Sequence, residues 1–300
     1  GRVVSWETFV EQYPPFSIAL DGFVGAPTNR DLFGPRANFD HHTGSDRLAT
    51  RSTSEQVHLE INMGLLERFR QRGRTKARLF INDCDQDTAM AIWLMVNSHR
   101  VRNHVDPAVT RLINTMGLQD TTGGMYPFGN TPQIRKNAWV FGAYSDARKE
   151  GRLRGMTAKD MGHIVLETLD RITKHVDGKG AESSLETRYK VIGGGKGWSM
   201  VREKNTESRM FMVAKGINAF VSVMGKGRYV IARTSAWIPF PLEKIFAALN
   251  AAEKPGLVTD ENHWDGADTI GGSPYKTGSS LTEAQITEII EKVLADEKAD

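Results

Sequence analysis

Acidic and histidine side chains occur in four short groups that could share metal ions. The groups are Asp21; Asp40, His41 and His42; Asp83, Asp85 and Asp87; and Asp120. Carboxylates that are brought together repel one another, and a bound cation is the usual way to relieve that repulsion. The imidazole nitrogen of His41 favours Mn²⁺ over calcium, with Mg²⁺ or Zn²⁺ as further options. The residue types therefore predict a divalent metal site.

The elements around these groups indicate an α/β fold. Phe16–Leu20 and Ala77–Asn82 have the composition of buried strands, whereas Ser54–Arg70 and Thr88–Asn97 carry apolar residues at helical spacing. This alternation predicts a mostly parallel N-terminal sheet flanked by helices. Ligands bind at the carboxyl ends of such strands, so we expect all four groups to lie at strand ends and to converge.

The second part of the chain has a different sequence pattern, with short strands separated by glycine-rich turns. Residues 175–183 are rich in glycine and polar residues, and we interpret them as a linker. The strands expected beyond it are Thr187–Ile192, Ser199–Arg202, Met210–Val213, Ala219–Met224 and Tyr229–Arg233. Helices are expected at Pro241–Glu253 and from Thr282, where Thr282 and Gln285 can form a capping box. We therefore expect a first domain at 1–180 and a smaller C-terminal α/β domain with a mixed sheet at 181–300.

Composition narrows the class of protein. The 300 residues are 39% hydrophobic and 25% charged, with a net charge of +3 and one cysteine. No apolar run approaches the ~20 residues that a membrane span needs, so we expect a cytoplasmic protein without a membrane partner. The charge is too balanced for a concentrated basic face, and long nucleic acid is not an expected partner. A phosphorylated small molecule or a short oligonucleotide stays open, and the oligomeric state is not indicated.

Each group also has a structural reading. Alternating aspartates are often a solvated turn whose acids cap a helix, and a pair of histidines is more often structural than catalytic. The spacing does not fit an EF-hand, which needs a glycine and a distal glutamate at fixed positions. The four groups together favour metal chemistry over four separate structural roles.

Three of these stretches resemble motifs of the DHH phosphoesterase superfamily. They are Asp40-His41-His42 with Ser52-Thr53-Ser54 leading into a helix, Asp85-Gln86-Asp87, and Asp120-Thr121-Thr122-Gly123. The superfamily includes single-strand exonucleases, oligoribonucleases, cyclic-dinucleotide phosphodiesterases, exopolyphosphatases and class II pyrophosphatases. The resemblance implies metal-dependent hydrolysis of a phosphoester or phosphoanhydride of the nucleotide, oligonucleotide or polyphosphate class.

The resemblance also implies roles for single residues. Two ions are expected, Mn²⁺ first and Mg²⁺ as the alternative. One would be held by Asp85, Asp21 and Asp83, and the other by Asp87, His41, Asp120 and the bridging Asp21. Asp40 would orient His41, and His42 would face the substrate phosphate as a hydrogen-bond donor or general acid.

Substrate contacts are expected in the C-terminal domain, which resembles the DHH-associated substrate-binding domain. Its glycine-rich loop would present the backbone amides and hydroxyls of Gly271, Gly272, Ser273, Gly278, Ser279 and Ser280 to a phosphate. Arg47, Arg51 and Arg188 are candidate arginines for the same ligand, although exposed arginines are usually only solvated. Gly193–Gly197 lacks the Lys-Ser/Thr ending of a P-loop and is better explained as a hairpin turn.

Two departures from the family pattern motivate an alternative. The Asp-x-Asp motif comes third along this chain, whereas the family has it first, and Asp83 or Ile81 stands where the family has a histidine. The alternative is a non-catalytic module that keeps the DHH scaffold to bind nucleotides or other partners. A nuclease for single strands would need a basic groove interleaved with aromatic residues, which the sequence order does not show.

Overall fold

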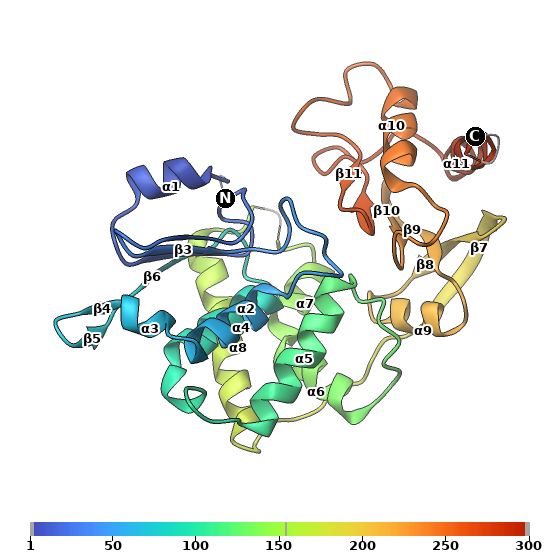
Figure 1. Ribbon diagram of the computed structural model, residues 1–300. Helices are drawn as coiled ribbons and strands as arrows, with labels where there is room; N and C mark the ends of the chain where they lie inside the picture. The colour runs from blue at the N-terminus through green and yellow to red at the C-terminus, as the bar shows by residue number, and fades with distance from the viewer. Residues whose placement is uncertain (1–2, 154, 298–300) are drawn as a thin grey trace. The chain divides into compact units, whose positions relative to one another are not determined.

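The computed structural model describes residues 3–153 and 155–297, and the chain divides into two compact units (Figure 1). The first unit comprises Gly1–Thr121 and Asn130–Leu185, and the second comprises Thr122–Gly129 and Glu186–Asp300. Helices and strands alternate in both, which confirms the expected α/β class. The main division therefore lies at 185/186, compared with the expected 180/181, and 122–129 belongs to the second unit.

The first unit is built on a four-stranded, mostly parallel sheet. Its strands are β1 (Ser17–Leu20), β2 (Asn29–Asp31), β3 (Arg36–Phe39) and β6 (Arg78–Phe80), in the order β2-β3-β1-β6. The central strand β1 is parallel to both β3 and β6, whereas β2 is antiparallel to β3. The carboxyl ends of β1, β3 and β6 therefore share one edge of the sheet, as the sequence pattern predicts.

Helices and a small hairpin complete this unit (Figure 1). They are α1 (Trp6–Gln12), α2 (Thr53–Asn62), α3 (Leu65–Arg68), β4 (Arg70–Gln71), β5 (Arg74–Thr75), α4 (Gln86–Val96), the 3-10 turn Ser98–Arg100, α5 (Pro107–Thr121), α6 (Pro132–Val140), α7 (Gly142–Lys149) and α8 (Ala158–Val176). The prediction of one helix over Ser54–Arg70 is wrong, because Gly64 has a φ of 109° and separates α2 from α3. Glycine tolerates this left-handed backbone, which a helix interior does not contain.

The core of the first unit lies between the sheet and the helices. Leu20 and Phe39 are fully buried and pack in one cluster with Trp93 of α4. The indole N–H of Trp93 donates to Thr173 of α8 over 2.9 Å, so the longest helix is fixed against α4. This packing holds the strand ends and the start of α4 in place.

The second unit contains a six-stranded mixed sheet. Its strands are β7 (Tyr189–Gly195), β8 (Trp198–Glu203), β9 (Ala219–Gly225), β10 (Arg228–Arg233), β11 (Asp265–Gly266) and β12 (Ile270–Gly272), in the order β11-β12-β10-β9-β8-β7. The β7–β8 connection is a hairpin, in agreement with the prediction for Gly193–Gly197. The expected strand Met210–Val213 is instead part of helix α9 (Ser208–Ala214). A crossover is required there because β8 and β9 are parallel.

The last two helices pack beside this sheet. Helix α10 (Leu242–Ala252) starts after Pro241, and α11 (Glu283–Asp296) begins at the predicted capping box of Thr282 and Gln285. Ile245 of α10 and Ile290 of α11 are fully buried in one cluster. None of the described helices combines the length and apolar character that crossing a bilayer requires.

The segment 122–129 gives a test of the division into units. Met125 is buried among Val201, Met212, Phe220 and Ala232, all of which belong to the second unit. We expect Met125→Ala to destabilise the second unit by about 2–5 kcal/mol, the usual cost of truncating a buried methionine. Hydrogen exchange should then accelerate in peptides from β9 and stay unchanged in peptides from β1.

Met63→Ala is the matched control, because Met63 lies in the first unit and is 71% exposed. Unchanged protection of β9 in Met125→Ala would contradict the assignment of 122–129.

Candidate metal centre

Three of the four predicted groups lie at the shared edge of the parallel sheet. Asp21 follows β1 directly and has a positive φ of 52°, which turns the chain sharply as it leaves the strand. Asp40, His41 and His42 follow β3, and Asp85 caps the start of α4 just beyond β6. The prediction that Asp120 also lies at a strand end is wrong, because Asp120 lies in the last turn of α5.

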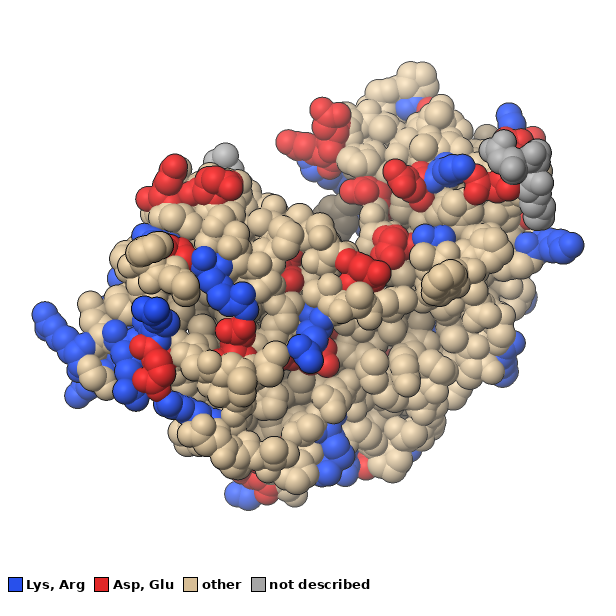
Figure 2. Space-filling model, in the orientation of Figure 1, with Lys and Arg blue, Asp and Glu red and all other residues tan. Residues whose placement is uncertain are grey.

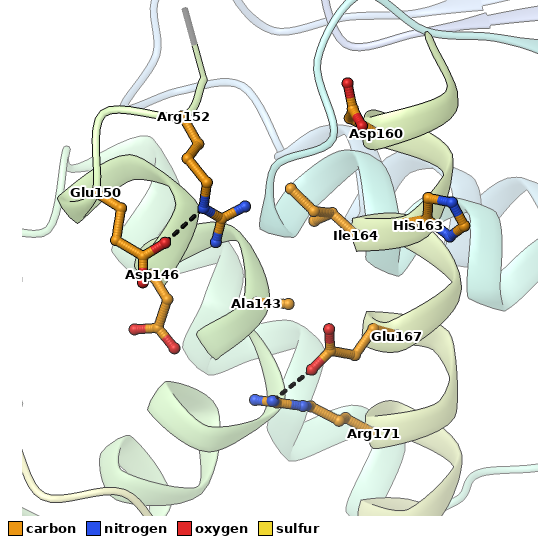
Figure 3. Close-up of a pocket in the computed structure, with 9 residues that line it drawn as sticks. All are labelled: Ala143, Asp146, Glu150, Arg152, Asp160, His163, Ile164, Glu167 and Arg171. Carbon is orange, nitrogen blue, oxygen red and sulfur yellow. Dashed lines mark hydrogen bonds and ion pairs between the residues drawn. The ribbon is translucent and has the colours of Figure 1, made fainter. Parts of the chain in front are cut away.

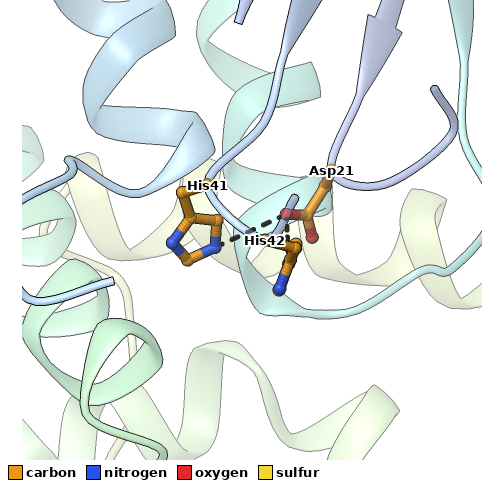
Figure 4. A group of neighbouring side chains, drawn as sticks. All are labelled: Asp21, His41 and His42. Carbon is orange, nitrogen blue, oxygen red and sulfur yellow. Dashed lines mark hydrogen bonds and ion pairs between the residues drawn. The ribbon is translucent and has the colours of Figure 1, made fainter. Parts of the chain in front are cut away.

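His41 lies at the centre of a cluster of carboxylates. Its side chain is fully buried, and its Nε2 is 2.9 Å from Oδ2 of Asp120. The same nitrogen is 3.6 Å from Oδ1 of Asp21 and 3.6 Å from Oδ2 of Asp87. Figure 4 shows both His41 and His42 directed at the Asp21 carboxylate. Two overlapping groups of ligand atoms result, one with Asp21, His41 and His42 and one with His41, Asp87 and Asp120.

Several buried polar atoms of this cluster lack a hydrogen-bond partner. Among the described residues these include both ring nitrogens of His41 and Oδ2 of Asp120. The His41–Asp120 approach of 2.9 Å is thus an ion-pair contact without hydrogen-bond geometry. Buried polar atoms are normally paired, and exceptions call for an explanation such as a bound ion. A nitrogen and carboxylate oxygens converging in this way fit the donor set of a divalent cation.

Asp21 connects the cluster to its surroundings. Its Oδ1 accepts from Nε2 of His42 over 2.9 Å and from the Thr53 hydroxyl over 3.1 Å. Its Oδ2 accepts from the Thr88 hydroxyl over 3.2 Å. Burial opposes ionisation of Asp21, but the hydrogen bond from His42 and the charges of the two histidines outweigh it and lower the pKa to about 2. Asp21 is therefore held as a carboxylate.

Asp87 is anchored to the start of another helix. Its Oδ2 accepts from the backbone N–H of Thr53 over 2.7 Å, and its Oδ1 from that of Ser54 over 2.8 Å. These are the first two amides of α2, where unpaired donors and the helix dipole favour an anion. Even so, burial and the negative charges of Asp120 and Asp21 raise the pKa of Asp87 to about 7.

Asp85 and His41 experience the same crowding of negative charge. Burial, followed by the carboxylates of Asp21 and Asp120, raises the pKa of Asp85 well above its usual range. One Asp85 oxygen accepts from the Thr88 amide as the helix cap. Burial disfavours the charged form of His41, but Asp120 and the other carboxylates outweigh it and raise its pKa. The excess negative charge is what a cation would neutralise.

Two predicted residues do not join the cluster. Asp83 is exposed, and its carboxylate accepts from the Tyr144 hydroxyl over 3.0 Å and from the Cys84 amide over 2.7 Å. Asp40 is buried, but its Oδ2 accepts from the Thr43 amide over 2.9 Å and makes no hydrogen bond to His41. The predicted role of Asp40 in orienting the His41 ring is therefore wrong. Asp40 shapes the loop that carries both histidines.

Arg47, and not Arg51, is the arginine of this site. The Arg47 Nη2 donates to the carbonyl oxygen of Asp120 over 3.0 Å and lies 3.6 Å from its Oδ2. Its Nη1 donates to Nδ1 of His42 over 3.3 Å. Arg51 has an exposed side chain, and its backbone carbonyl accepts a hydrogen bond from the Gln56 side chain. A contact between Arg51 and the substrate stays a prediction.

The glycine-rich loop does not offer the expected amides. Gly271 and Gly272 are in β12, paired on both sides with β10 and β11. A Cβ at Gly271 would come within 2.4 Å of the Phe246 ring, so close packing explains this glycine. The Ser273 amide donates to the Tyr229 carbonyl over 3.0 Å.

The later residues of that loop are also engaged with the protein. The amides of Gly278 and Ser279 donate to the carbonyls of Pro274 and Gly227. The amide and hydroxyl of Ser280 both donate to one oxygen of Glu253. These donors stabilise the turn before α11 and do not form the predicted phosphate cradle.

A separate polar hollow lies between α7 and α8 (Figure 3). It has a volume of about 340 Å³ and is lined by Ala143, Asp146, Glu150, Arg152, Asp160, His163, Ile164, Glu167 and Arg171. Its arginines pair within it, Arg152 with Glu150 and Arg171 with Glu167. No residue of the His41 cluster lines this hollow, so it is no part of the candidate metal centre.

Supporting residues of the site were not all recognisable from the sequence. Thr53 and Thr88, whose hydroxyls donate to Asp21, both lie in the first turn of a helix: Thr53 directly follows the N-cap Ser52, and Thr88 is three residues after the N-cap Asp85. That capping signal predicts a helix start but does not say which carboxylate the hydroxyl will meet. The backbone amides of α2 that donate to Asp87 have no sequence signature, because nearly every residue type has a backbone N–H.

No family model matches the chain, and no curated protein matches it either.

The crowding of carboxylates predicts how the metal-free protein responds to pH. A carboxyl whose folded pKa is raised stabilises the fold below its unfolded pKa, and this stabilisation is lost as pH rises through the folded value. For Asp87 that interval runs from 3.8 to about 7, and Asp85 acts in the same direction. We expect the melting temperature in a chelator to fall between pH 5 and pH 8. Saturating Mn²⁺ should offset the fall.

Asp85→Asn should have opposite effects on stability and on metal affinity. Asparagine keeps the helix cap but removes one charge from the crowded cluster. We expect the metal-free variant to gain about 1 kcal/mol at pH 8, roughly 2–4 °C in melting temperature for a protein of this size. Its affinity for Mn²⁺, measured by calorimetry, should fall. Asp46→Asn, outside the cluster, serves as control, and a less stable metal-free Asp85→Asn would contradict the account.

Proposed function

We propose that the first unit is a divalent-metal-dependent phosphohydrolase that cleaves a phosphoester or phosphoanhydride. The observation that carries the proposal is the convergence of His41 with Asp21, Asp87 and Asp120 in a buried cluster. Three carboxylates around one imidazole suit Mn²⁺ or Mg²⁺ better than soft metals. The resemblance to the DHH phosphoesterases, stated from the sequence motifs, supplies the class of reaction.

The residues that would hold a cation are these four, with His42 at the edge of the cluster. Divalent cations in such sites polarise phosphoryl oxygens and make water acidic enough to serve as a nucleophile near neutral pH. The proposal for a second ion rests on Asp21, which faces both histidines, and on Asp85. Asp85 is in neither of the two groups of ligand atoms, but its second oxygen is not used as a helix cap.

His42 can handle a proton at a defined atom. The Arg47 guanidinium always donates, so Nδ1 of His42 accepts and the proton of the neutral ring is at Nε2. That N–H points to Oδ1 of Asp21, on the cluster side of the ring. The side chain is 37% exposed, whereas His41 is fully buried. We assign His42 to donate to a phosphoryl or leaving-group oxygen of the substrate.

Arg47 supplies positive charge beside the same place. Its guanidinium is largely buried and holds both Asp120 and His42, while its Nε has no partner among the described residues. It fixes the orientation of the His42 ring and offsets negative charge next to Asp120. The role of the second unit as a substrate-binding domain rests on the resemblance alone.

The alternative is a non-catalytic binding module on the same scaffold. The position of Asp83 favours it, because this residue contacts Tyr144 and stays out of the cluster. One of the two proposed ion positions then has fewer ligands than the resemblance implies. A module of this kind would bind a cation or nucleotide without turning it over.

Two histidine variants separate metal binding from turnover. His41→Ala removes the nitrogen at the centre of the cluster, and we expect Mn²⁺ affinity to fall roughly a hundredfold or more, since even outer-shell partners contribute 10–100-fold. His42→Gln should keep Mn²⁺ but lower kcat by roughly 10²–10⁴, the contribution of a general acid. Calorimetry with Mn²⁺ and phosphate release from a nucleotide, an oligonucleotide and a polyphosphate give the two readouts.

His104→Ala is the control, because His104 is an exposed histidine of the same unit. Mn²⁺ binding without phosphate release from any of the three substrate classes would favour the binding module. Full Mn²⁺ affinity in His41→Ala would refute the metal centre itself.

A further inference from the structure

The hairpin β4–β5 carries a concentration of positive charge that the function proposed above does not use. Residues 68–78 contain six basic side chains and no acidic one, and all six are exposed. They are Arg68, Arg70, Arg72, Arg74, Lys76 and Arg78. Figure 2 shows Lys and Arg side chains gathered over this hairpin. The small net charge of the chain conceals this local excess.

Most of these cations lack an acidic neighbour. Within residues 3–153 and 155–297, Arg70 pairs with Glu67 over 3.5 Å, and none of the other five has a carboxylate within ion-pair distance. Lys76 donates to the neutral side chain of Gln71. Exposed cations are ordinarily interspersed with acids on a protein surface. Five uncompensated cations within residues 68–78, on the hairpin and directly beside it, form the electrostatic footprint of a polyanion-binding surface.

The geometry of the hairpin distributes these cations over both of its faces. Arg70 is opposite Thr75 and Gln71 is opposite Arg74. Opposed residues of an antiparallel pair share a face, so Arg74 projects from one side of the ribbon and Arg70 from the other. A hollow of about 720 Å³ lies against the hairpin and is lined by Gln71, Arg72, Arg74, Thr75 and Lys76.

The tip of the hairpin also presents a cation. Arg72 and Gly73 both have positive φ, 50° and 76°, as the two-residue loop of a type I′ hairpin requires. Asparagine or aspartate is favoured at the first of these positions, and arginine is there at a conformational cost. Charge is therefore present on both faces and at the tip.

We propose that the β4–β5 hairpin binds double-helical nucleic acid by entering a groove between its two phosphate strands. A ribbon with cations on both faces can contact the phosphates on both sides of a groove. A flat membrane surface would contact only one face of the ribbon. Residues 68–78 also lack an exposed large apolar side chain to insert in a bilayer, because Phe69 is buried and the exposed apolar residue is the small Ala77. A two-stranded ribbon fits the major groove of B-form DNA.

The mode of binding follows from the same residues. Without an exposed aromatic side chain for base stacking, the hairpin has no means of preferring single strands. Contacts to phosphates alone give binding that is independent of sequence and strongly dependent on salt. The hairpin immediately precedes the amino end of β6, at the opposite end of that strand from Asp85. The proposed surface is therefore separate from the metal centre and does not rest on its activity.

The test is fluorescence anisotropy with a labelled 20-base-pair DNA duplex in the presence of EDTA, which removes metal-dependent hydrolysis from the experiment. We expect log Kobs to fall linearly with log salt, with a slope of roughly −3 to −4.5 for three to five phosphate contacts. The triple variant Arg72→Gln/Arg74→Gln/Lys76→Gln should reduce the magnitude of that slope by roughly 2–3 and weaken binding at low salt at least about tenfold.

A control variant with the same change in net charge separates local from overall charge. Lys159→Gln/Lys196→Gln/Lys254→Gln removes three exposed lysines outside the hairpin, and we expect wild-type affinity and slope. Equal losses in the two triple variants would overturn the proposal, as would tighter binding to a single strand of the same length. Binding to phosphatidylserine vesicles without binding to the duplex would overturn it in favour of a membrane surface.

Discussion

The interaction on which the rest of this structure depends is the mutual repulsion of the carboxylates around His41. Asp21, Asp85, Asp87 and Asp120 are brought together from three different segments of the chain, and most of this cluster is shielded from water. Burial and the charges of Asp120 and Asp21 raise the pKa of Asp87 to about 7. Asp21 differs because the hydrogen bond from His42 and the charges of both histidines lower its pKa to about 2. A fold that keeps such a cluster gives up stability for it, as active sites often do.

Hydrogen bonds from backbone amides and hydroxyl groups stabilise the carboxylates of the cluster in the folded chain. The first amides of α2 hold both oxygens of Asp87, and the hydroxyls of Thr53 and Thr88 hold Asp21 from two helix starts. Both helices begin beside the carboxyl edge of the sheet, so their positive ends face the negative charge. The parallel arrangement of β1, β3 and β6 is what places these helix starts and strand ends together.

Residue types and periodicity were sufficient to predict some of this arrangement. The alternation of helical and strand patterns predicted the α/β class. Asp21 and the two histidines follow apolar runs in the sequence, and that position predicted that they lie at the edge of the sheet. The helical location of Asp120 was missed because a polar Asp-Thr-Thr-Gly stretch is equally consistent with a loop and with a helix end. Met210–Val213 was assigned to a strand because short apolar runs have no distinguishing period.

Long-range contacts account for the remaining differences. The carboxylate of Asp83 accepts a hydrogen bond from Tyr144, sixty-one residues along the chain, and no local pattern predicts that contact. The glycines of β12 suit a phosphate loop and a crowded strand equally well, and the packing of Phe246 and Asp265 against Gly271 decides between the two. The small net charge led us to expect no concentrated basic face, and the six exposed cations of residues 68–78 were missed. The absence of nearby acids among the described residues is a property of the folded chain.

The most direct measurement of the central claim is an anomalous-difference map recorded at the manganese edge from crystals grown with MnCl₂. We expect a peak in contact with Nε2 of His41 and Oδ2 of Asp120, with Asp87 and Asp21 as neighbouring ligands. Ordered side chains in this cluster without a peak among them, or manganese bound solely at other carboxylates, would contradict the account.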